Sequence, residues 1–480
     1  MFFYCLAAFL LLAPLYKAGN RPVALLLLEL AAIAFILVVL VQCRGLPDLP
    51  RLLAIAIGLL LIYPLVQLIP LPGWLWRELP GHAPYAAVID RFAATEGIGP
   101  WRAISVVPSA TEYGWLALLP PLACLLGVLR LTKDDVGRLL LVMAICAGAE
   151  GLLGLLQVGP GGGGMLYLGN EEPGQNVAIG TFVNRNHLAA MLAMALPVIV
   201  GLLVFSMRPG RHRRKHPARP VASEAVAQRV LLFASAVLIM LCLLYTRSRA
   251  GIASGLVGLA SAAIVLVRAR AASVGTSRTK VASYIVACLV VVSVIIAFAI
   301  GVAPILSGLD VDRLQSSADF RWAIYVGALR AAIEFLPFGS GLSTFADVFP
   351  RFQVVDPGGL IDYAHNDYVQ AFMELGLTAP VIVLLLLVAY VVRMFELLLA
   401  EGGRSFTLLQ LGAGLGMLPM MLHSLFDFAL HMPANAMWFA TLAGVLFHQG
   451  VPDAPEPVVA GSRRQPVRMP DAATTTGVPA

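Results

Sequence analysis

The chain has 480 residues, of which 59% are apolar and only 12% are charged, and its mean hydropathy is +0.85. A water-soluble domain carries roughly 25% charged residues, so this composition excludes an ordinary cytosolic enzyme, a disordered protein and a secreted disulfide scaffold. Lysine and arginine (33) exceed aspartate and glutamate (27), and in a membrane protein this net charge of +6 bears on orientation and not on nucleic-acid binding.

Apolar runs of about twenty residues recur along the chain, and this is the length that a membrane-crossing helix needs. A backbone in lipid must satisfy its own hydrogen bonds, so we expect an all-α polytopic membrane protein. The first helix is expected to be retained, because residues 1–16 lack a charged n-region and a cleavage site. We place twelve transmembrane helices near residues 2–16, 22–42, 52–70, 112–130, 137–158, 187–207, 229–246, 250–267, 281–303, 377–400, 405–424 and 434–449.

The distribution of basic residues favours cytoplasmic termini, because this orientation puts most of them, including the run at 208–219, on the inner side. We expect residues 304–376 to form a helical periplasmic subdomain between helices 9 and 10, inserted into a helix bundle of residues 1–449. Residues 450–480 are rich in proline and alanine and are expected to form a disordered cytoplasmic tail. The outer segments that are too long for simple connections are 71–111, 159–186 and 304–376.

Arginine recurs at the outer ends of these helices. Arg247 and Arg249 lie in YTRSRAG between two spans. Arg321 lies in ADFRWAIY of the long outer segment, and Arg185 begins a span in TFVNRNHLA. Guanidinium groups stay charged in apolar surroundings and bind phosphate in bidentate fashion, so their convergence would form an anion site. If the turn is helical, Arg247 and Arg249 are about 200° apart, and we favour Arg249 as the ligand-facing one. Each could instead extend to lipid headgroups.

An amphipathic helix is predicted in the long outer segment, with Asp319 as its N-cap. Arg321 would then lie in the first turn, and Arg330 would point to the opposite side. A ligand bound by Arg321 should therefore not contact Arg330. The predicted apolar face consists of Trp322, Val326, Leu329, Ile333 and Leu336.

His365 lies in DYAHNDYVQAFMELG, which we expect to be helical and to run into the tenth span. Asp362 and Tyr368 would share its face, whereas Asp367 would be displaced by about 200°. A histidine near neutrality is the usual general base for deprotonating a hydroxyl, and Asp362 could orient it. The alternative is an interfacial histidine without a chemical role.

Two further patterns resemble ligand sites but are weaker. Asp310 and Asp312 form a DVD triplet like the metal-binding carboxylates of some glycosyltransferases, although a match of three residues is common by chance. The glycine run at 159–164 lacks the lysine and hydroxyl residue of a phosphate-binding loop. The six cysteines have no metal-ligand spacing. We therefore expect neither a metal site nor a cofactor.

Five segments, in this order and with this membrane spacing, resemble the O-antigen ligase and O-antigen polymerase superfamily. The similarity spans roughly residues 180 to 440 and does not include the first 110 residues. The segments are TFVNRNHLAAMLAM, YTRSRAG, DFRW with LPFGSGLSTF, YAHNDYVQAFMELG and HSLFDFALHMPANA.

This resemblance implies a metal-independent, inverting glycosyltransferase of lipopolysaccharide biosynthesis. Its site would face the periplasm from the inner membrane, and it would move a glycan from undecaprenyl diphosphate to a lipid A-core hydroxyl. Arg249 and Arg321 match arginines thought to engage the diphosphate, and His365 matches the proposed base. The YTRSRAG element departs from the family pattern by its extra arginine, Arg247. The remaining expected substrate-binding residues are Arg185, Asn186, Arg247, Asp362 and Tyr368. The resemblance assigns no role to Asn184, Asn186, His423 and Asp427, and of these four we expect only Asn186 to contact the substrate.

Other functions are compatible with the same residues. A polymerase of the superfamily would join repeat units, and a third branch glycosylates protein hydroxyls. We favour the ligase because the chain has one large outer segment late in the sequence and no soluble domain after the twelfth span. An anionic-lipid transporter would also use basic outer residues, but it predicts inverted repeats and broken helices that are not evident. A scaffold of a polysaccharide export complex would tolerate loss of His365.

Overall fold

The computed structural model describes most of the chain. Outside the described residues lie the predicted ninth span at 281–303, Asp310, most of the glycine run at 159–164, the basic run at 208–219 and the tail at 450–480. The described residues are 1–42, 45, 47–96, 99–158, 164–167, 177–207, 222–274, 311–354, 360–400 and 405–449.

The protein is an all-α polytopic membrane protein, as the hydropathy pattern predicted. Within the described residues, eight helices are long and apolar enough to cross a membrane, one of them formed by α6 and α7 together, and three shorter apolar helices accompany them. The long ones are α2 (Pro22–Gln42), α6 (Pro108–Leu116) with α7 (Leu119–Val128), α8 (Lys133–Val158), α9 (Arg185–Ser206), α10 (Ala222–Tyr245), α11 (Arg249–Val274), α17 (Thr378–Leu399) and α18 (Ser405–His423); the shorter ones are α1 (Phe2–Leu15), α3 (Arg51–Gln67) and α19 (Pro433–Phe447).

The helix predicted at 112–130 is divided in the structure. α6 ends at Leu116, and α7 starts at Leu119 with a proline in its first turn. Proline lacks the N–H that would continue the preceding helix, and its fixed φ suits a first helical turn, so the Pro120-Pro121 pair explains the division.

Helix α9 forms the centre of the bundle, and all its side chains from His187 to Val204 are buried. It packs against α18, α11 and α10. A Cβ atom added at Gly201 would lie 3.1 Å from the Cα atom of Gly412 on α18. Small residues at such contacts let helix backbones approach closely, which is how helices associate in lipid. The short helices η1 (Lys17–Gly19), η2 (Gly164–Tyr167) and η6 (Ala429–His431) connect elements of this bundle.

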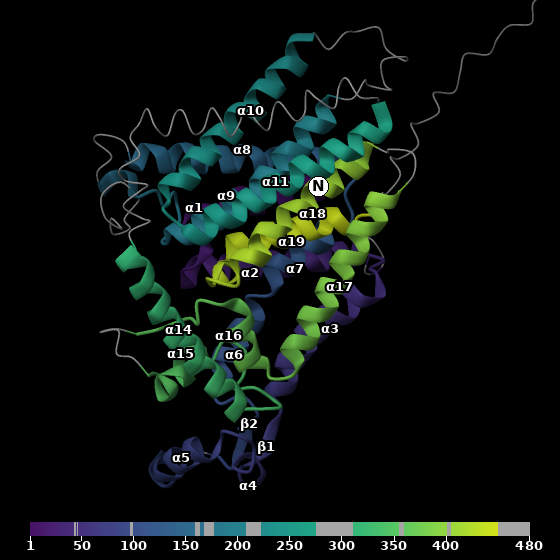
Figure 1. The fold of residues 1–480 in the computed structure, drawn as a ribbon. Coiled ribbons are helices and arrows are strands. Elements are labelled where there is room, and N and C mark those ends of the chain that lie inside the picture. The colour runs from purple at the N-terminus through teal and green to yellow at the C-terminus, as the bar shows by residue number, and fades with distance from the viewer. Residues whose placement is uncertain are drawn as a thin grey trace, which may run out of the picture.

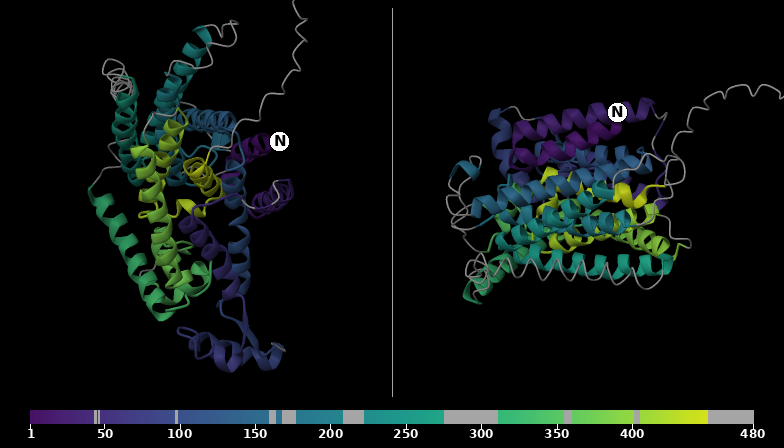
Figure 2. Two further views of the ribbon diagram at one scale, coloured as in Figure 1. Left: turned by 90° about the vertical axis from the view of Figure 1, so that its right-hand side faces the viewer. Right: turned by 90° about the horizontal axis from the view of Figure 1, so that it is seen from above.

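A smaller unit with its own hydrophobic cluster lies beside the bundle (Figure 1). It contains α14 (Val311–Glu334), α15 (Phe345–Val348), η5 (Phe349–Phe352) and α16 (Asp367–Leu375). The long helices α3 and α17 run side by side and lead to it (Figure 2). At the junction, the amide of Gln67 on α3 donates hydrogen bonds to the carbonyl oxygens of Glu374 (2.8 Å) and Phe338 (3.0 Å).

The predicted start and apolar face of α14 are wrong. The helix begins at Val311, so Asp319 lies inside it and is not the N-cap. Trp322 and Ile333 of the predicted face are 68% and 66% exposed, and the buried side chains are Ile324, Ala328, Ala331, Ala332 and Phe335. Gly327 explains the difference, because a Cβ atom there would lie 2.8 Å from the carbonyl oxygen of Phe352. The helix packs through its small residues, which a pattern of large apolar residues does not reveal.

A second feature that we did not predict is a two-stranded antiparallel ribbon within residues 70–103. Strand β1 (Pro70–Pro72) pairs with β2 (Trp101–Ala103), with Pro72 opposite Trp101. Between the strands lie α4 (Gly73–Trp76) and α5 (Ala83–Glu96). We call residues 70–103 the tip unit, because Figure 1 shows these elements at the end of the molecule farthest from α10 and α8.

Candidate functional site

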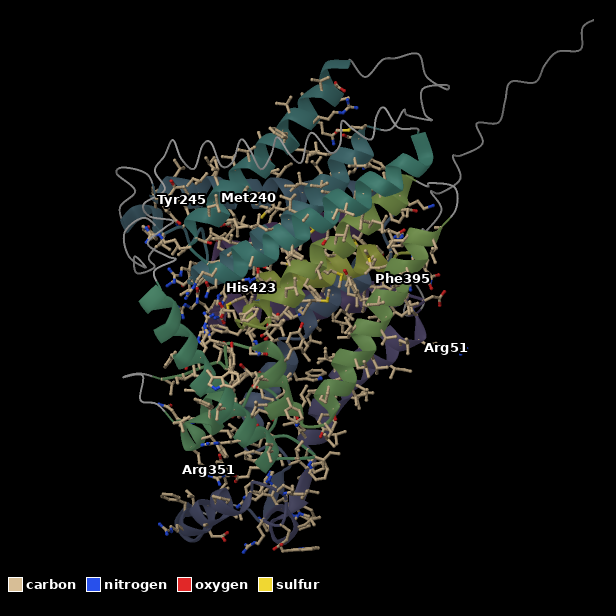
Figure 3. All side chains as sticks on the ribbon, viewed as in Figure 1. Arg51, Met240, Tyr245, Arg351, Phe395 and His423 are labelled. Carbon is tan, nitrogen blue, oxygen red and sulfur yellow. The ribbon has the colours of Figure 1, made fainter. Side chains whose placement is uncertain are left out.

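The four predicted arginines come from three elements that meet in the structure. Arg185 begins α9, Arg247 and Arg249 lie at the turn between α10 and α11, and Arg321 lies on α14. Arg185 interacts electrostatically with the other three arginines and with Asp427. Figure 3 shows nitrogen-bearing side chains gathered near the labelled His423, between α14 and the long helices. Like charges at such proximity repel one another, so this arrangement favours an anion that neutralises them.

The sequence around Arg249 explains how α11 reaches α9. The hydroxyl of Ser248 accepts a hydrogen bond from the backbone N–H of Gly251 (3.3 Å) and so caps the helix. A Cβ atom added at Gly251 would lie 2.4 Å from the Cβ atom of Ala189 on α9. Only glycine therefore allows the first turns of the two helices, which begin at Arg249 and Arg185, to approach this closely.

The helical-phase argument that separated Arg247 from Arg249 does not hold in the structure. Arg247 has a φ of +53°, in the left-handed region, so the turn between α10 and α11 is not helical. Both guanidinium groups are close enough to act on Arg185. Arg247 therefore belongs to the same cluster as Arg249.

His365 is held by a carboxylate that follows it by 62 positions. Its Nδ1 atom lies 3.2 Å from Oδ1 of Asp427, which is 1% exposed, whereas the His365 side chain is 26% exposed. The same oxygen accepts the backbone N–H of Phe428 at 3.0 Å. Burial would raise the pKa of Asp427, but the hydrogen bond from His365 and the neighbouring His423 and His187 hold it well below its usual range. An ionised Asp427 keeps the proton of His365 on Nδ1 and leaves Nε2 free to accept one.

Asp362 does not occupy the place that the sequence suggested. It is exposed, and the segment up to His365 is not helical. Helix α16 begins only at Asp367, where the side chain of Asn366 accepts the N–H groups of Tyr368 and Val369. His365 has a φ of +53°, so three-residue spacing does not place Asp362 on its face. The hydroxyl of Tyr368 donates to the carbonyl oxygen of Met421 (2.8 Å), on α18.

Tyr325 connects the arginine cluster to His365. It follows Arg321 by one turn of α14, and its hydroxyl donates a hydrogen bond to the carbonyl oxygen of His365 (2.8 Å). Burial raises the pKa of Tyr325, with the charge of Arg321 acting in the opposite direction and that of Asp427 in the same one. The hydroxyl of Tyr325 is therefore close to both charges, and Arg321 shares one site with the His365–Asp427 pair.

Two histidines that the sequence left without a role surround this pair. His423 and His187 are 0% and 3% exposed, and Nε2 of His423 lies 3.8 Å from Oδ2 of Asp427. The ring of Phe428 contacts the rings of both His187 (centroids 4.8 Å apart) and His365 (5.0 Å) in edge-to-face arrangements. In the HSLFD motif, His423 and Asp427 are four residues apart, which is about one helical turn. This spacing is the signal in the sequence that could have predicted their proximity.

A second histidine–carboxylate pair lies close by. Nδ1 of His431 is 2.8 Å from Oδ1 of Asp367. The side-chain oxygen of Gln370 accepts the N–H of Ala364 (3.0 Å), which turns its amide nitrogen toward Nε2 of His431 (3.1 Å) and Oε1 of Glu374 (3.0 Å). In this orientation Nε2 of His431 accepts a hydrogen bond from the amide N–H of Gln370. The proton of the His431 ring then lies on Nδ1, which faces Asp367. Asp367 thus belongs to a separate, structural network.

Asn186 lies beside Arg185 in the first turn of α9, where its backbone N–H donates to the side chain of Asn184 (2.8 Å). This contact caps α9 at the arginine cluster. Asn184 thereby acquires a structural role, whereas the side chain of Asn186 remains a predicted substrate contact.

Comparison with known proteins supports the sequence motifs. The model of the family described as O-Antigen ligase matches residues 234–384, a stretch that contains Arg249, Arg321 and His365 but neither Arg185 nor Asp427. No curated protein matches the chain significantly. The resemblance found in the motifs is confirmed by this match. The chain is therefore a multi-pass membrane protein that resembles the O-antigen ligase and O-antigen polymerase superfamily, whose members are membrane glycosyltransferase-like enzymes.

Proposed function

We propose that this protein is an O-antigen ligase-type glycosyltransferase of the bacterial inner membrane. It takes a glycan from undecaprenyl diphosphate and attaches it to a hydroxyl of a lipid A-core acceptor on the periplasmic face, with both termini in the cytoplasm. The observation that carries this proposal is the His365–Asp427 pair, which Tyr325 links to the arginine cluster.

The arginine cluster suits the leaving group. When the bond between the anomeric carbon and the diphosphate oxygen breaks, negative charge accumulates on the diphosphate. Fixed guanidinium groups stabilise that charge where it develops, without having to reorganise. Arg249 and Arg321 are assigned to the diphosphate, and Arg185 and Arg247 add positive potential around it.

The His365–Asp427 pair suits the attacking hydroxyl. Nε2 of His365 removes the hydroxyl proton as the oxygen bonds to the anomeric carbon, and Asp427 stabilises the imidazolium that forms. A single displacement inverts the configuration at that carbon. The products are the glycosylated acceptor and the undecaprenyl diphosphate anion, and the proton remains on His365 until it passes to water.

The proposal is tested with purified protein in proteoliposomes, labelled undecaprenyl diphosphate-linked glycan and lipid A-core acceptor. We expect transfer in the presence of a chelator, and a loss of about 100-fold or more in Arg321→Ala and His365→Ala. Arg330→Ala is the matched control, because Arg330 is an exposed arginine of the same helix. Transfer at the native rate by the two folded variants would refute the mechanism. Elongation of carrier-linked repeats without transfer to the core would identify a polymerase, and dependence on a divalent cation would contradict metal independence.

A further inference from the structure

The tip unit contains a hollow that the proposed reaction does not use. Its volume is about 480 Å³, within the range of about 300–1,000 Å³ that is usual for small-molecule sites. Tryptophan is concentrated there: the chain has six, and Trp74, Trp76 and Trp101 all line this hollow. Its charged lining residues are Arg77, Asp90 and Arg102. The hollow lies outside the match to the O-antigen ligase family.

The three tryptophans have different environments. Trp76 is 2% exposed, and its indole N–H donates to the carbonyl oxygen of Ala103, so it is a fixed part of the ribbon. Trp74 and Trp101 are 69% and 60% exposed. Trp101 is paired with Pro72 across the ribbon, and the N–H of Gly73 donates to the carbonyl oxygen of Pro100 (2.8 Å). The backbone that carries the two exposed indoles is therefore fixed before any ligand arrives.

The polar residues of the hollow are paired and remain accessible. Arg77 and Asp90 form an ion pair at 3.3 Å, and their side chains are 48% and 54% exposed. Arg102 donates to the carbonyl oxygens of Gly99 and Trp101. Planar guanidinium and carboxylate groups beside exposed indoles are complementary to a sugar. The C–H face of a pyranose stacks on the negative face of an aromatic ring, and its vicinal hydroxyls form bidentate hydrogen bonds.

The tip unit is joined firmly to the unit that carries Arg321. The ring of His82 contacts the rings of Trp76 and of Phe335, the residue that follows α14, with ring centroids 4.8 Å and 5.6 Å apart. The guanidinium of Arg351, labelled in Figure 3, lies over the ring of Tyr85 on α5 at 5.7 Å. Figures 1 and 2 both show α4 and α5 beyond α15 and α16, away from the end of α14 that approaches α11. A ligand in the hollow is thus held at a fixed place apart from the arginine cluster.

We propose that the hollow formed by Trp74, Trp76 and Trp101 with Arg77, Asp90 and Arg102 is a glycan-binding subsite that holds sugars of the transferred chain distant from its reacting end. This inference rests on the proposed function for the identity of the glycan. A lipid surface is the competing occupant, because Val88 and Phe92 on α5 are also exposed. The concave lining and the ion pair favour the sugar, since an interfacial helix inserts a continuous apolar face into the membrane.

The subsite is tested by binding, independently of transfer. The probe is end-labelled polysaccharide released by mild acid from the carrier lipid of the producing organism, and its fluorescence polarisation is measured with detergent-solubilised full-length protein. We expect at least a 10-fold loss of affinity in the double variant Trp74→Ala/Trp101→Ala, and a loss of severalfold in Arg77→Met. Phe92→Ala is the matched control, because this exposed aromatic residue of α5 does not line the hollow, and its affinity should stay within twofold of the native value.

Three results would overturn the subsite. The first is native affinity for the polysaccharide in the folded double variant, and the second is an equal loss of affinity in Phe92→Ala. The third is quenching of the fluorescence of Trp74 and Trp101 by brominated lipids in proteoliposomes. The fluorescence of these two residues is obtained by subtracting the signal of the Trp74→Phe/Trp101→Phe variant from that of the native protein. Transfer assays then separate the proposed subsite from the proposed transfer mechanism. With a polymeric donor, the KM of the double variant should be about 10-fold higher than that of the native protein, and its kcat should be unchanged. With a single-repeat donor, the double variant should have the native KM and kcat. Failure of Arg321→Ala to reduce transfer would refute the mechanism while the binding result stands.

Discussion

Replacing Asp427 by asparagine tests whether this carboxylate acts through its charge. The substitution keeps an oxygen that can accept from Nδ1 of His365 and from the N–H of Phe428, so the geometry around Oδ1 is retained. What is lost is the negative charge that stabilises the imidazolium formed during transfer. At the observed 3.2 Å, two unit charges interact by about 5 kcal/mol if the effective dielectric constant is about 20.

Solvent reduces this interaction, because the His365 side chain is 26% exposed while Asp427 is 1% exposed. We therefore expect about 3 kcal/mol of lost transition-state stabilisation, which is a decrease in the transfer rate of roughly 100-fold. The assay is single-turnover transfer from labelled lipid-linked glycan in proteoliposomes, with a thermal melt to show that the variant is folded.

Asp362→Asn provides the comparison, because Asp362 is the carboxylate that the sequence favoured for the same role and it is exposed. Its rate should fall by less than threefold. The reasoning is wrong if folded Asp427→Asn transfers glycan at the native rate, or if Asp362→Asn loses as much activity as Asp427→Asn.

Further predictions follow from the same site. Tyr325→Phe removes the hydrogen bond to the carbonyl oxygen of His365, worth about 1 kcal/mol, so single-turnover transfer should slow by about fivefold, and an unchanged rate would contradict this positioning role. Arg321→Lys keeps the charge but not the bidentate geometry, so its rate should lie between the native and Arg321→Ala rates, and a rate equal to the alanine variant would argue against a role for charge alone. Inorganic pyrophosphate should raise the melting temperature of the native protein and not that of an Arg249→Ala/Arg321→Ala variant. The depressed pKa of Asp427 stabilises the fold above the ordinary aspartate pKa of about 3.9, and this stabilisation is lost as the pH falls through the folded-state pKa; melting curves measured from pH 6 to 3 should therefore show a smaller decrease in Asp427→Asn.

The long helices could be predicted because lipid imposes a length and an apolar composition on any segment that crosses it. Helices α2, α8, α9 and α17 all lie close to their predicted spans. The arginine cluster could be anticipated because guanidinium groups recur at the ends of apolar runs, and helix ends lie at the surface of a bundle, where an anion can reach them. Neither argument depends on contacts between distant parts of the chain.

What the sequence did not reveal depends on such contacts. Asp427 lies 62 positions from His365, and the pairing arises because the segment after α18 packs beside the start of α16, where the N–H of Asp367 donates to the carbonyl oxygen of Ser424 (2.9 Å). The left-handed conformation of His365 likewise cannot be predicted from the pattern, because residues other than glycine adopt it only uncommonly. The sequence pattern indicated a continuous helix through His365, and it therefore predicted Asp362 as the carboxylate that orients this histidine.

The arrangement of helix ends explains how the site can hold a diphosphate when four arginines repel one another. Helices α9 and α11 begin at Arg185 and Arg249, so the positive ends of their dipoles lie where the guanidinium groups are. The close contact at Gly251 fixes these two ends against each other. Arg321 comes from α14, outside the bundle, and Tyr325 ties its position to His365. Because Arg321 lies on α14 whereas Arg185 and Arg249 begin helices of the bundle, a shift of α14 relative to α9 and α11 would change the position of Arg321 relative to the other arginines. The alignment of leaving group and attacking hydroxyl therefore depends on the contact between α14 and the bundle as much as on any single residue.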